Sequence, residues 1–263
     1  MERKWWTLVL VSIATFMLLL DVTVVNVALP DIQRALFLYL TIYIQGVLDF
    51  SPLEAGLRFL PLTILGFVVA PISGALSNRI PIRILLGVGM TLVGIGLLLM
   101  HGVSVDSKWT TLLAGFVVAG IGIGITNPGI GQAAIAVVPP QKAGMGSGIN
   151  TTFRQIGIAT GVAGLGAVFQ SRVDSKLSEL LPNVPDGLGE LVASGGSRAA
   201  ATAHIAGVAP GRIGRAAAAA FVSGFNEIIL IAAVLTFIGA ALGFALVRSQ
   251  DFVQRGGPPP AAD

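Results

Sequence analysis

Six apolar runs, each long enough to cross a bilayer, dominate this chain of 263 residues. The hydrocarbon core of a membrane is about 30 Å thick, and a helix needs about 20 mostly apolar residues to span it. The runs are approximately Trp5–Leu29, Leu57–Leu76, Ile82–Met100, Thr110–Ile125, Thr151–Phe169 and Phe225–Val247, and the Thr110 run can extend towards Val138. We therefore expect an all-α fold, a polytopic transmembrane helix bundle with six full spans plus one short segment.

The composition excludes several classes of protein. Hydrophobic residues make up 54% of the chain and charged residues only 11%, whereas soluble domains carry about 25% charged residues. There is no cysteine and there are two histidines, so disulfides, metal sites and other cofactors are not expected. The net charge is only +3 and the basic residues are scattered, so no nucleic acid is expected as a partner. The apolar composition predicts the lipid bilayer as the partner instead. No nucleophile–base pairing, phosphate-binding loop or metal-ligand spacing indicates an enzyme.

The seventh apolar run, Ala35–Leu48, is too short for a certain span, because it would reach only about 21 Å as a helix. In membrane proteins generally, basic residues are concentrated in the cytoplasmic loops. If this run does not cross and the N-terminus is cytoplasmic, Arg79, Arg83 and Lys142 fall on the cytoplasmic side. If it does cross, all three move outside. The charge distribution therefore favours six spans, a short interfacial or re-entrant segment and two cytoplasmic termini.

The expected organisation follows from these spans. Residues 1–34 form the first transmembrane helix, and 35–56 form a short apolar segment and outer turn. A four-span membrane bundle occupies 57–169, and an outer loop covers 170–217. The last transmembrane helix is expected at 218–247 and a disordered cytoplasmic tail at 248–263. The outer loop contains SRVDSKLSELL and an Ala/Gly-rich run, and we expect it to be a flexible cap.

An acid interrupts the first apolar run, in LLLDVTVVNVALP. Asp21 lies about 16 residues into this run, and Asn26 follows it on a neighbouring part of the helix surface. A charged side chain at the centre of a membrane costs about 2.5–3.5 kcal/mol on insertion scales. Asp21 either handles protons or cations inside the protein or lies hydrated near the outer interface.

Several strings along the chain carry a family resemblance. LDVTVVNVALPDIQ resembles the first-span signature of the fourteen-span drug:proton antiporters (EmrB/QacA type) of the major facilitator superfamily. YIQGVLDFSPLEAGLRFLP resembles the end of that family's ninth span and the start of its tenth. VVPPQKAGMGSGINTTFRQIGIATGVAGLGAVF resembles its twelfth-to-thirteenth connection. The resemblance implies multidrug efflux across a bacterial plasma membrane, in which amphipathic or cationic small molecules are exchanged for protons. Asp21 would then be the proton-coupling acid, and the chain would form one half of a major facilitator fold.

Two further motifs resemble parts of the same family. GALSNRIPIR (Gly74–Arg83) resembles a cytoplasmic loop that latches neighbouring helices. Asn78 replaces the usual acid and Pro81 a glycine, so a plain basic turn built on Arg79 and Arg83 remains an alternative.

The second motif resembles the glycine-rich antiporter helix. Gly120, Gly122 and Gly124 precede TNPGIG, in which Pro128 is expected to kink the helix. Gly120 and Gly124 lie four residues apart, so one face is bare and a neighbouring helix can approach closely. Packing alone could require this spacing.

Four other polar residues are candidates for the substrate path or for coupling. Asn150 and Arg154 lie four residues apart on one helix face. Arg154 either extends to the inner interface or points into a cavity, where it would tune an acid. Tyr43 and Gln45 would line a substrate path if their segment reaches the core.

The resemblance also implies a large internal deletion. Family members are roughly twice as long, and the sequence passes between Gln33 and Phe37 from just after the first span to the middle of the ninth. Drug pathways of this superfamily run between two bundles, so a monomer of this chain is not expected to transport.

Two hypotheses concern what remains. In one, Trp5–Leu29 takes the place of the ninth span, leaves the short segment as a displaced stub at the outer surface, and allows two bundles to pair as a homodimer. The alternative is a non-transporting degenerate fragment or a helix bundle that binds a partner protein.

Overall fold

The computed structural model describes residues 36–77, 79–136, 143–181, 184, 187–200 and 209–246, and every regular element in these ranges is a helix. The expected all-α bundle is therefore confirmed for the described residues. The first expected span, with Asp21 and Asn26, lies outside them, as does Asn78. The elements are a short helix over Leu36–Val47 that ends in the π-helix η1 (Tyr43–Val47), α2 (Pro52–Arg58), α3 (Leu60–Leu76), α4 (Ile82–Met100), the 3₁₀-helix η2 (Trp109–Leu112), α5 (Leu113–Ala136), α6 (Ala143–Leu180), α7 (Leu188–Ala200) and α8 (Pro210–Leu246).

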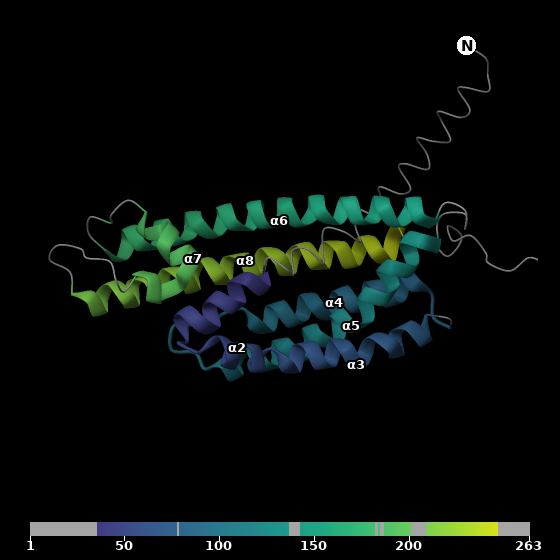
Figure 1. Ribbon diagram of the computed structural model, residues 1–263, viewed down its shortest axis with the longest axis horizontal. Coiled ribbons are helices and arrows are strands. Elements are labelled where there is room, and N and C mark those ends of the chain that lie inside the picture. The colour runs from purple at the N-terminus through teal and green to yellow at the C-terminus, as the bar shows by residue number, and fades with distance from the viewer. Residues whose placement is uncertain are drawn as a thin grey trace, which may run out of the picture.

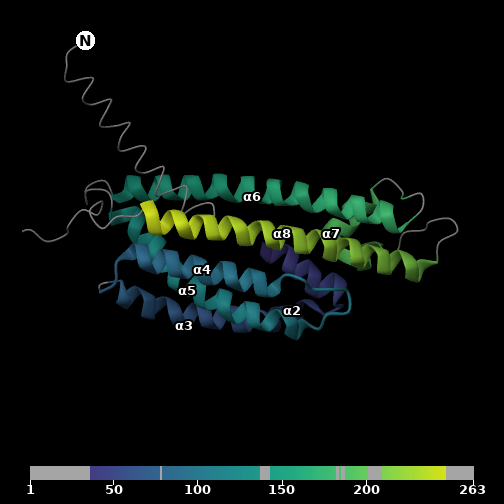
Figure 2. The same ribbon diagram turned by 180° about the vertical axis from the view of Figure 1, so that it is seen from behind.

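Five of the six expected spans fall within the described residues. The helices α4, α5, α6 and α8 contain segments long and apolar enough to cross a membrane, and α2 with α3 forms a fifth if the bent pair counts as one span. In Figures 1 and 2, α6 lies along one edge of the bundle, α8 lies beside it, and α3, α4 and α5 lie on the other side of α8. Within this arrangement α4 packs against both α5 and α8, and α5 also packs against α3.

The span expected to begin at Leu57 is divided into two helices, which meet at an angle of 43°. The Ser51 hydroxyl accepts a hydrogen bond from the Glu54 backbone N–H, and the Glu54 carboxylate accepts one from the Ser51 N–H. This capping box starts α2. Pro61 lies in the first turn of α3. Because proline lacks an N–H and fits the first helical turn best, it starts a new helix and does not continue α2.

The prediction of a flexible loop at 170–217 is wrong over most of that range. Helix α6 continues through Phe169 to Leu180, α7 follows it, and α8 already begins at Pro210. Val173, Leu177 and Leu181 recur every four residues and are buried, so the apolar stripe of α6 continues beyond the membrane. Together, α7 and the outer ends of α6 and α8 form a packed helical cap.

The short helix Leu36–Val47 belongs to this end of the molecule and reaches only about 18 Å. Leu36, Leu40, Tyr43 and Ile44 are buried, and the segment packs against α7 and α8. The segment thus lies at the outer end of the bundle, buried beneath the helical cap, and its origin as a displaced stub stays a prediction. Its large apolar side chains gain more from burial between the ends of α6, α7 and α8 than from a surface position.

The turn between α4 and α5 is held by α8 and by the short helix. The backbone N–H of Gly102 donates to Asn226 Oδ1 (2.9 Å), and Asn226 Nδ2 donates to the carbonyl of Val103 (2.9 Å). Gly102 has a φ of +85°, a conformation that favours glycine. The Tyr43 hydroxyl donates to the carbonyl of Ser104 (3.2 Å). One carboxamide on α8 thus ties the α4–α5 turn to the rest of the bundle.

We expect Asn226→Ala to lower the free energy of unfolding by about 1–3 kcal/mol, because it removes both hydrogen bonds and leaves the polar groups of the turn unpaired. Asn226→Asp keeps the acceptor and loses the donor, so its effect should be smaller. Ser194→Ala on the exposed surface of α7 serves as the control. Thermal melting of the purified protein measures all three, and equal melting of the alanine variant and the unchanged protein would contradict the role of this clamp.

Candidate functional site

Two glycines of α5 lie directly against the backbone of α3. A Cβ atom on Gly120 would lie 2.6 Å from the carbonyl oxygen of Leu62, and one on Gly124 would lie 2.8 Å from that of Gly66. Neither distance leaves space for a side chain. The helices α3 and α5 therefore approach each other at backbone contact along the face that these two glycines share.

The next glycine faces α4. A Cβ atom on Gly122 would lie 2.6 Å from the carbonyl oxygen of Gly89 and 2.7 Å from the backbone nitrogen of Val93. The Ser73 hydroxyl of α3 donates to the carbonyl of Ile125 in α5 (2.8 Å). Pro128 lies one turn further on and α5 continues as one helix through it. Helix α5 is thus wedged between α3 and α4, with no room between them for a substrate.

Tyr43 belongs to an aromatic cluster at the outer end of the bundle. Its ring is fully buried and stacks on that of Phe225 of α8, with 5.2 Å between the ring centroids. Tyr39 lies 4.5 Å from the ring of Phe169 of α6 in the same cluster. The Tyr43 side chain is thus enclosed by its neighbours in this structure, and its place in a substrate path stays a prediction. Gln45 is half-buried on the same π-helical turn.

Arg154 is the fourth residue of the apolar segment Thr151–Leu180 of α6 and lies level with the central parts of α4 and α8. It is about 16 Å from the start of α6 at Ala143, a distance longer than an arginine side chain. Phe169 of α6 contacts Phe221 of the antiparallel α8 (5.0 Å between centroids). Arg154 lies 15 residues before Phe169 in α6, and Thr236 lies 15 residues after Phe221 in α8. Because the two helices are antiparallel, Arg154 is level with Thr236 and Phe237.

The depth of Arg154 in the bundle can also be compared with the depth of residues in α4. A Cβ atom on Gly94, in the central part of α4, would lie 2.9 Å from the ring of Phe237. Arg154 is half-buried, and no hydrogen bond or ion pair joins its side chain to another residue that the structure describes. A guanidinium at this depth needs water, an acid or a polar ligand beside it. The position favours the interior alternative for Arg154 over the inner interface. Asn150 lies in the preceding turn of α6.

In the loop that resembles a latch, Gly74–Arg83, no hydrogen bond or ion pair of a described residue joins neighbouring helices. Gly74 lies in the last turn of α3, and a Cβ atom there would meet nothing within 4 Å. Arg79 and Arg83 are exposed, and neither forms an ion pair with a described residue. A latch at this position stays a prediction.

Two charged contacts at the opposite end were not expected from the sequence. The Arg58 guanidinium lies 3.4 Å from the ring centroid of Phe50, and its Nη1 donates to the carbonyl of Glu54 (2.8 Å). Arg172 of α6 pairs with Glu227 of α8 at 3.1 Å. Glu227 and Arg172 are 55 positions apart in the sequence, so no local pattern could have paired them.

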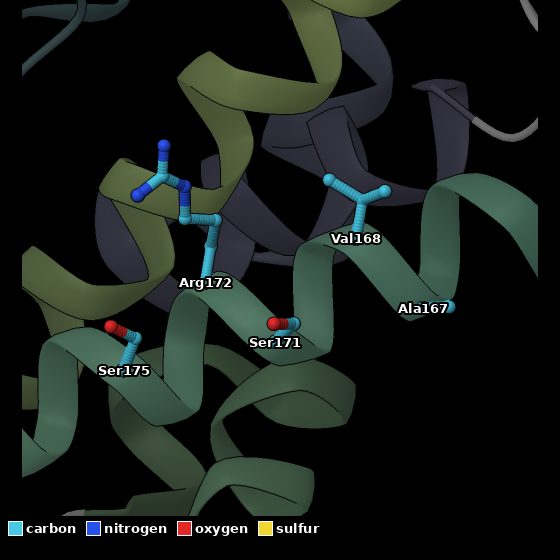
Figure 3. A pocket seen from close by; sticks show the side chains of 5 residues that line it. All are labelled: Ala167, Val168, Ser171, Arg172 and Ser175. Carbon is cyan, nitrogen blue, oxygen red and sulfur yellow. The ribbon is translucent and has the colours of Figure 1, made fainter.

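A hollow of about 450 Å³ lies beside α6 (Figure 3). The described residues that line it are Ala167, Val168, Ser171, Arg172 and Ser175. All of these belong to α6, so the described part of the hollow is a groove along the side of that helix.

Comparisons with known proteins agree with this architecture. The sequence model of the Major Facilitator Superfamily matches residues 2–162. The chain is 29% identical over 208 residues to the multidrug efflux pump LfrA of Mycolicibacterium smegmatis, an alignment that covers 78% of this chain and 40% of that protein. It is 30% identical over 213 residues to the tetracenomycin C resistance and export protein of Streptomyces glaucescens, covering 78% and 39%. The chain thus spans about two fifths of the length of these relatives.

We expect Gly120→Ala to destabilise the bundle by about 1–3 kcal/mol, because its methyl group would overlap the backbone of α3. Gly164→Ala is the matched control, since a Cβ atom at Gly164 in α6 meets nothing within 4 Å. The measurement is the thermal midpoint of each variant in detergent. Similar midpoints for the two variants would show that α3 and α5 are not in backbone contact.

Proposed function

Because the chain belongs to the Major Facilitator Superfamily, we propose that it takes part in the proton-coupled export of amphipathic, drug-like compounds across the plasma membrane. Relatives over the same stretch are named as efflux or resistance proteins, among them the multidrug efflux pump and the tetracenomycin exporter. Members of this superfamily are carriers, which confirms that the chain is not an enzyme. The proposal includes descent from the fourteen-span type through an internal deletion between Gln33 and Phe37.

The observation that favours transport most is the position of Arg154. A permanently charged side chain near mid-membrane is costly unless it faces water, a counter-charge or a passing ligand. A purely structural bundle gains nothing from it. In the proposed mechanism Asp21 binds and releases the coupling proton, and Arg154 together with Asn150 contributes a polar lining to the path. Tyr43 and Gln45 are the remaining candidates for that lining.

One bundle cannot enclose a pathway of this superfamily, because such pathways run between two bundles. We therefore propose that two copies pair in the lipid bilayer as a homodimer, with one bundle from each. The glycine-wedged unit of α3, α4 and α5 would keep each bundle from leaking ions.

Asp21→Asn is expected to reduce efflux of a cationic dye such as ethidium at least tenfold in cells that express the chain, because an amide cannot carry a proton. Glu190→Gln is the matched control, since it neutralises an exposed acid of α7 outside the membrane part. Efflux is measured as loss of dye fluorescence after energisation. Full efflux by Asp21→Asn would exclude Asp21 as the proton carrier.

The second function, a non-transporting bundle, predicts a different outcome of the same assay. Cells with the unchanged chain, with Asp21→Asn and with no insert would accumulate equal amounts of dye, although the protein is inserted in the membrane. The short length relative to the named relatives is the observation that supports this alternative.

The proposed orientation places both termini in the cytoplasm. The native chain has no cysteine, so single cysteines report on each side. We expect Ser77→Cys, after α3, to be shielded from an impermeant thiol reagent in intact cells, and Ser107→Cys, at the opposite end of the bundle, to be labelled. The reverse labelling pattern would mean that the topology is inverted.

A further inference from the structure

One helix of the bundle is far less covered than the others. Only 17% of the most apolar window of α6 is buried, compared with 44% to 50% for α4, α5 and α8. Exposed residues of α6 with spacings of three and four form one ridge. This ridge, called the α6 face below, consists of Gly148, Thr152, Gln155, Ala159 and Ala163, all of them exposed.

The chemistry of the α6 face differs from that of a surface that meets lipid. The exposed ridge of α3 carries Ile64, Phe67 and Val68, with Phe67 82% exposed. The α6 face carries glycine, alanine, threonine and glutamine, with the exposed side chains of Met145 and Ile156 beside them, and a Cβ atom at Gly148 meets nothing within 4 Å. Small residues in membranes mark the places where another helix approaches closely, and glutamine side chains form hydrogen bonds across such contacts.

Gln155 provides an independent indication of a missing neighbour. It lies beside Arg154, within the apolar segment Thr151–Leu180 of α6, and its side chain is exposed. No hydrogen bond joins it to another described residue. A carboxamide that faced hydrocarbon would leave its polar atoms unpaired, at a cost of several kcal/mol. The α6 face therefore needs a helix that supplies a polar partner at this level.

The length of chain before Leu36 identifies the occupant. Trp5–Leu29 is apolar and long enough for about 37 Å of helix, and it lies outside the described residues. Residues 30–35 can bridge at most roughly 20 Å, so Leu29 has to end near Leu36. The short helix begins beside the outer end of the α6 face, because a Cβ atom on Gly166 would lie 3.3 Å from the Tyr39 hydroxyl.

We infer that Trp5–Leu29 packs as a helix parallel to α6 against the α6 face, and that it brings the Asp21 carboxyl group within hydrogen-bonding reach of Gln155. With Leu29 level with Ala167, Asp21 lies level with Ala159, one turn from Gln155. Helical side chains tilt towards the N-terminus, so the carboxyl group leans towards Gln155. The docking does not depend on transport, and only the role of Asp21 as proton carrier rests on the proposed function.

Disulfide formation in the full chain tests the contact. Cysteine is placed at Val22, Thr23, Val24 or Val25 in turn, which covers a full turn of the first span, and is paired with Ala163→Cys. A protease site inserted at 137–142 separates the first span from α6. At least one pair is expected to form a disulfide that holds the two fragments together on a non-reducing gel. Leu230→Cys, at an exposed apolar position of α8 on the same fragment as α6, replaces Ala163→Cys in the control series.

Three outcomes would overturn the inference. Disulfides with Leu230→Cys and none with Ala163→Cys would place the first span on α8. A doubled mass before protease treatment would assign the α6 face to a second copy of the chain. Absence of any disulfide in both series, with a short bifunctional maleimide as well as with oxidant, would leave the first span away from both helices.

The contact between Asp21 and Gln155 has its own test in a double-mutant cycle. Asp21→Ala and Gln155→Ala are each expected to lower the thermal midpoint, and the double variant should lose less than the sum of the two, because each change removes the same interaction. Additive losses would show that the two side chains do not interact. Since both measurements read contact and not efflux, a chain that fails to transport can still confirm the docking.

Discussion

Backbone contact between α5 and its two neighbours organises the membrane part of this protein. Inside a bilayer, apolar side chains gain nothing by leaving lipid for one another, so helices associate through close van der Waals packing and hydrogen bonds. Gly120 and Gly124 admit the backbone of α3, Gly122 admits that of α4, and Ser73 adds a buried hydrogen bond. The position of α4 against α8 depends on this unit, and the outer turn is in turn tied to α8 through Asn226.

On the opposite side of the bundle, no helix in the described part of the chain is wedged between two neighbours as α5 is. Helix α6 contacts α8 along one side, chiefly through the aromatic cluster and the Arg172–Glu227 pair at its outer end. Its membrane part keeps a small-residue face and two polar side chains, Arg154 and Gln155, away from described partners. A carrier built on this plan would combine one rigid half, which seals the bundle, with a half whose remaining surface is completed by the first span and a second copy.

The sequence predicted the membrane segments better than it predicted the helix ends. Ile82–Met100 was expected and observed with the same bounds, because Pro81 and His101 flank a continuous apolar run. The outer ends of α6 and α8 extend 11 and 15 residues beyond the expected runs, since hydropathy detects only the part of a helix that meets lipid. The spacing of Gly120 and Gly124 indicated a close neighbour but not which helix it is. The Asn226 clamp joins positions 123 and 124 residues apart, beyond any local pattern.

By itself, the sequence determined the fold class, the number of membrane segments in the described part and the superfamily, because apolar runs longer than the bilayer is thick leave only helices as a stable solution. The tertiary structure alone decided that the short segment Leu36–Val47 is buried, that the region at 170–217 is a helical cap, and that Tyr43 is enclosed by its neighbours. It also decided the depth of Arg154 and the exposure of Gln155. These properties depend on contacts between helices distant in sequence, and neither periodicity nor composition encodes which helix faces meet.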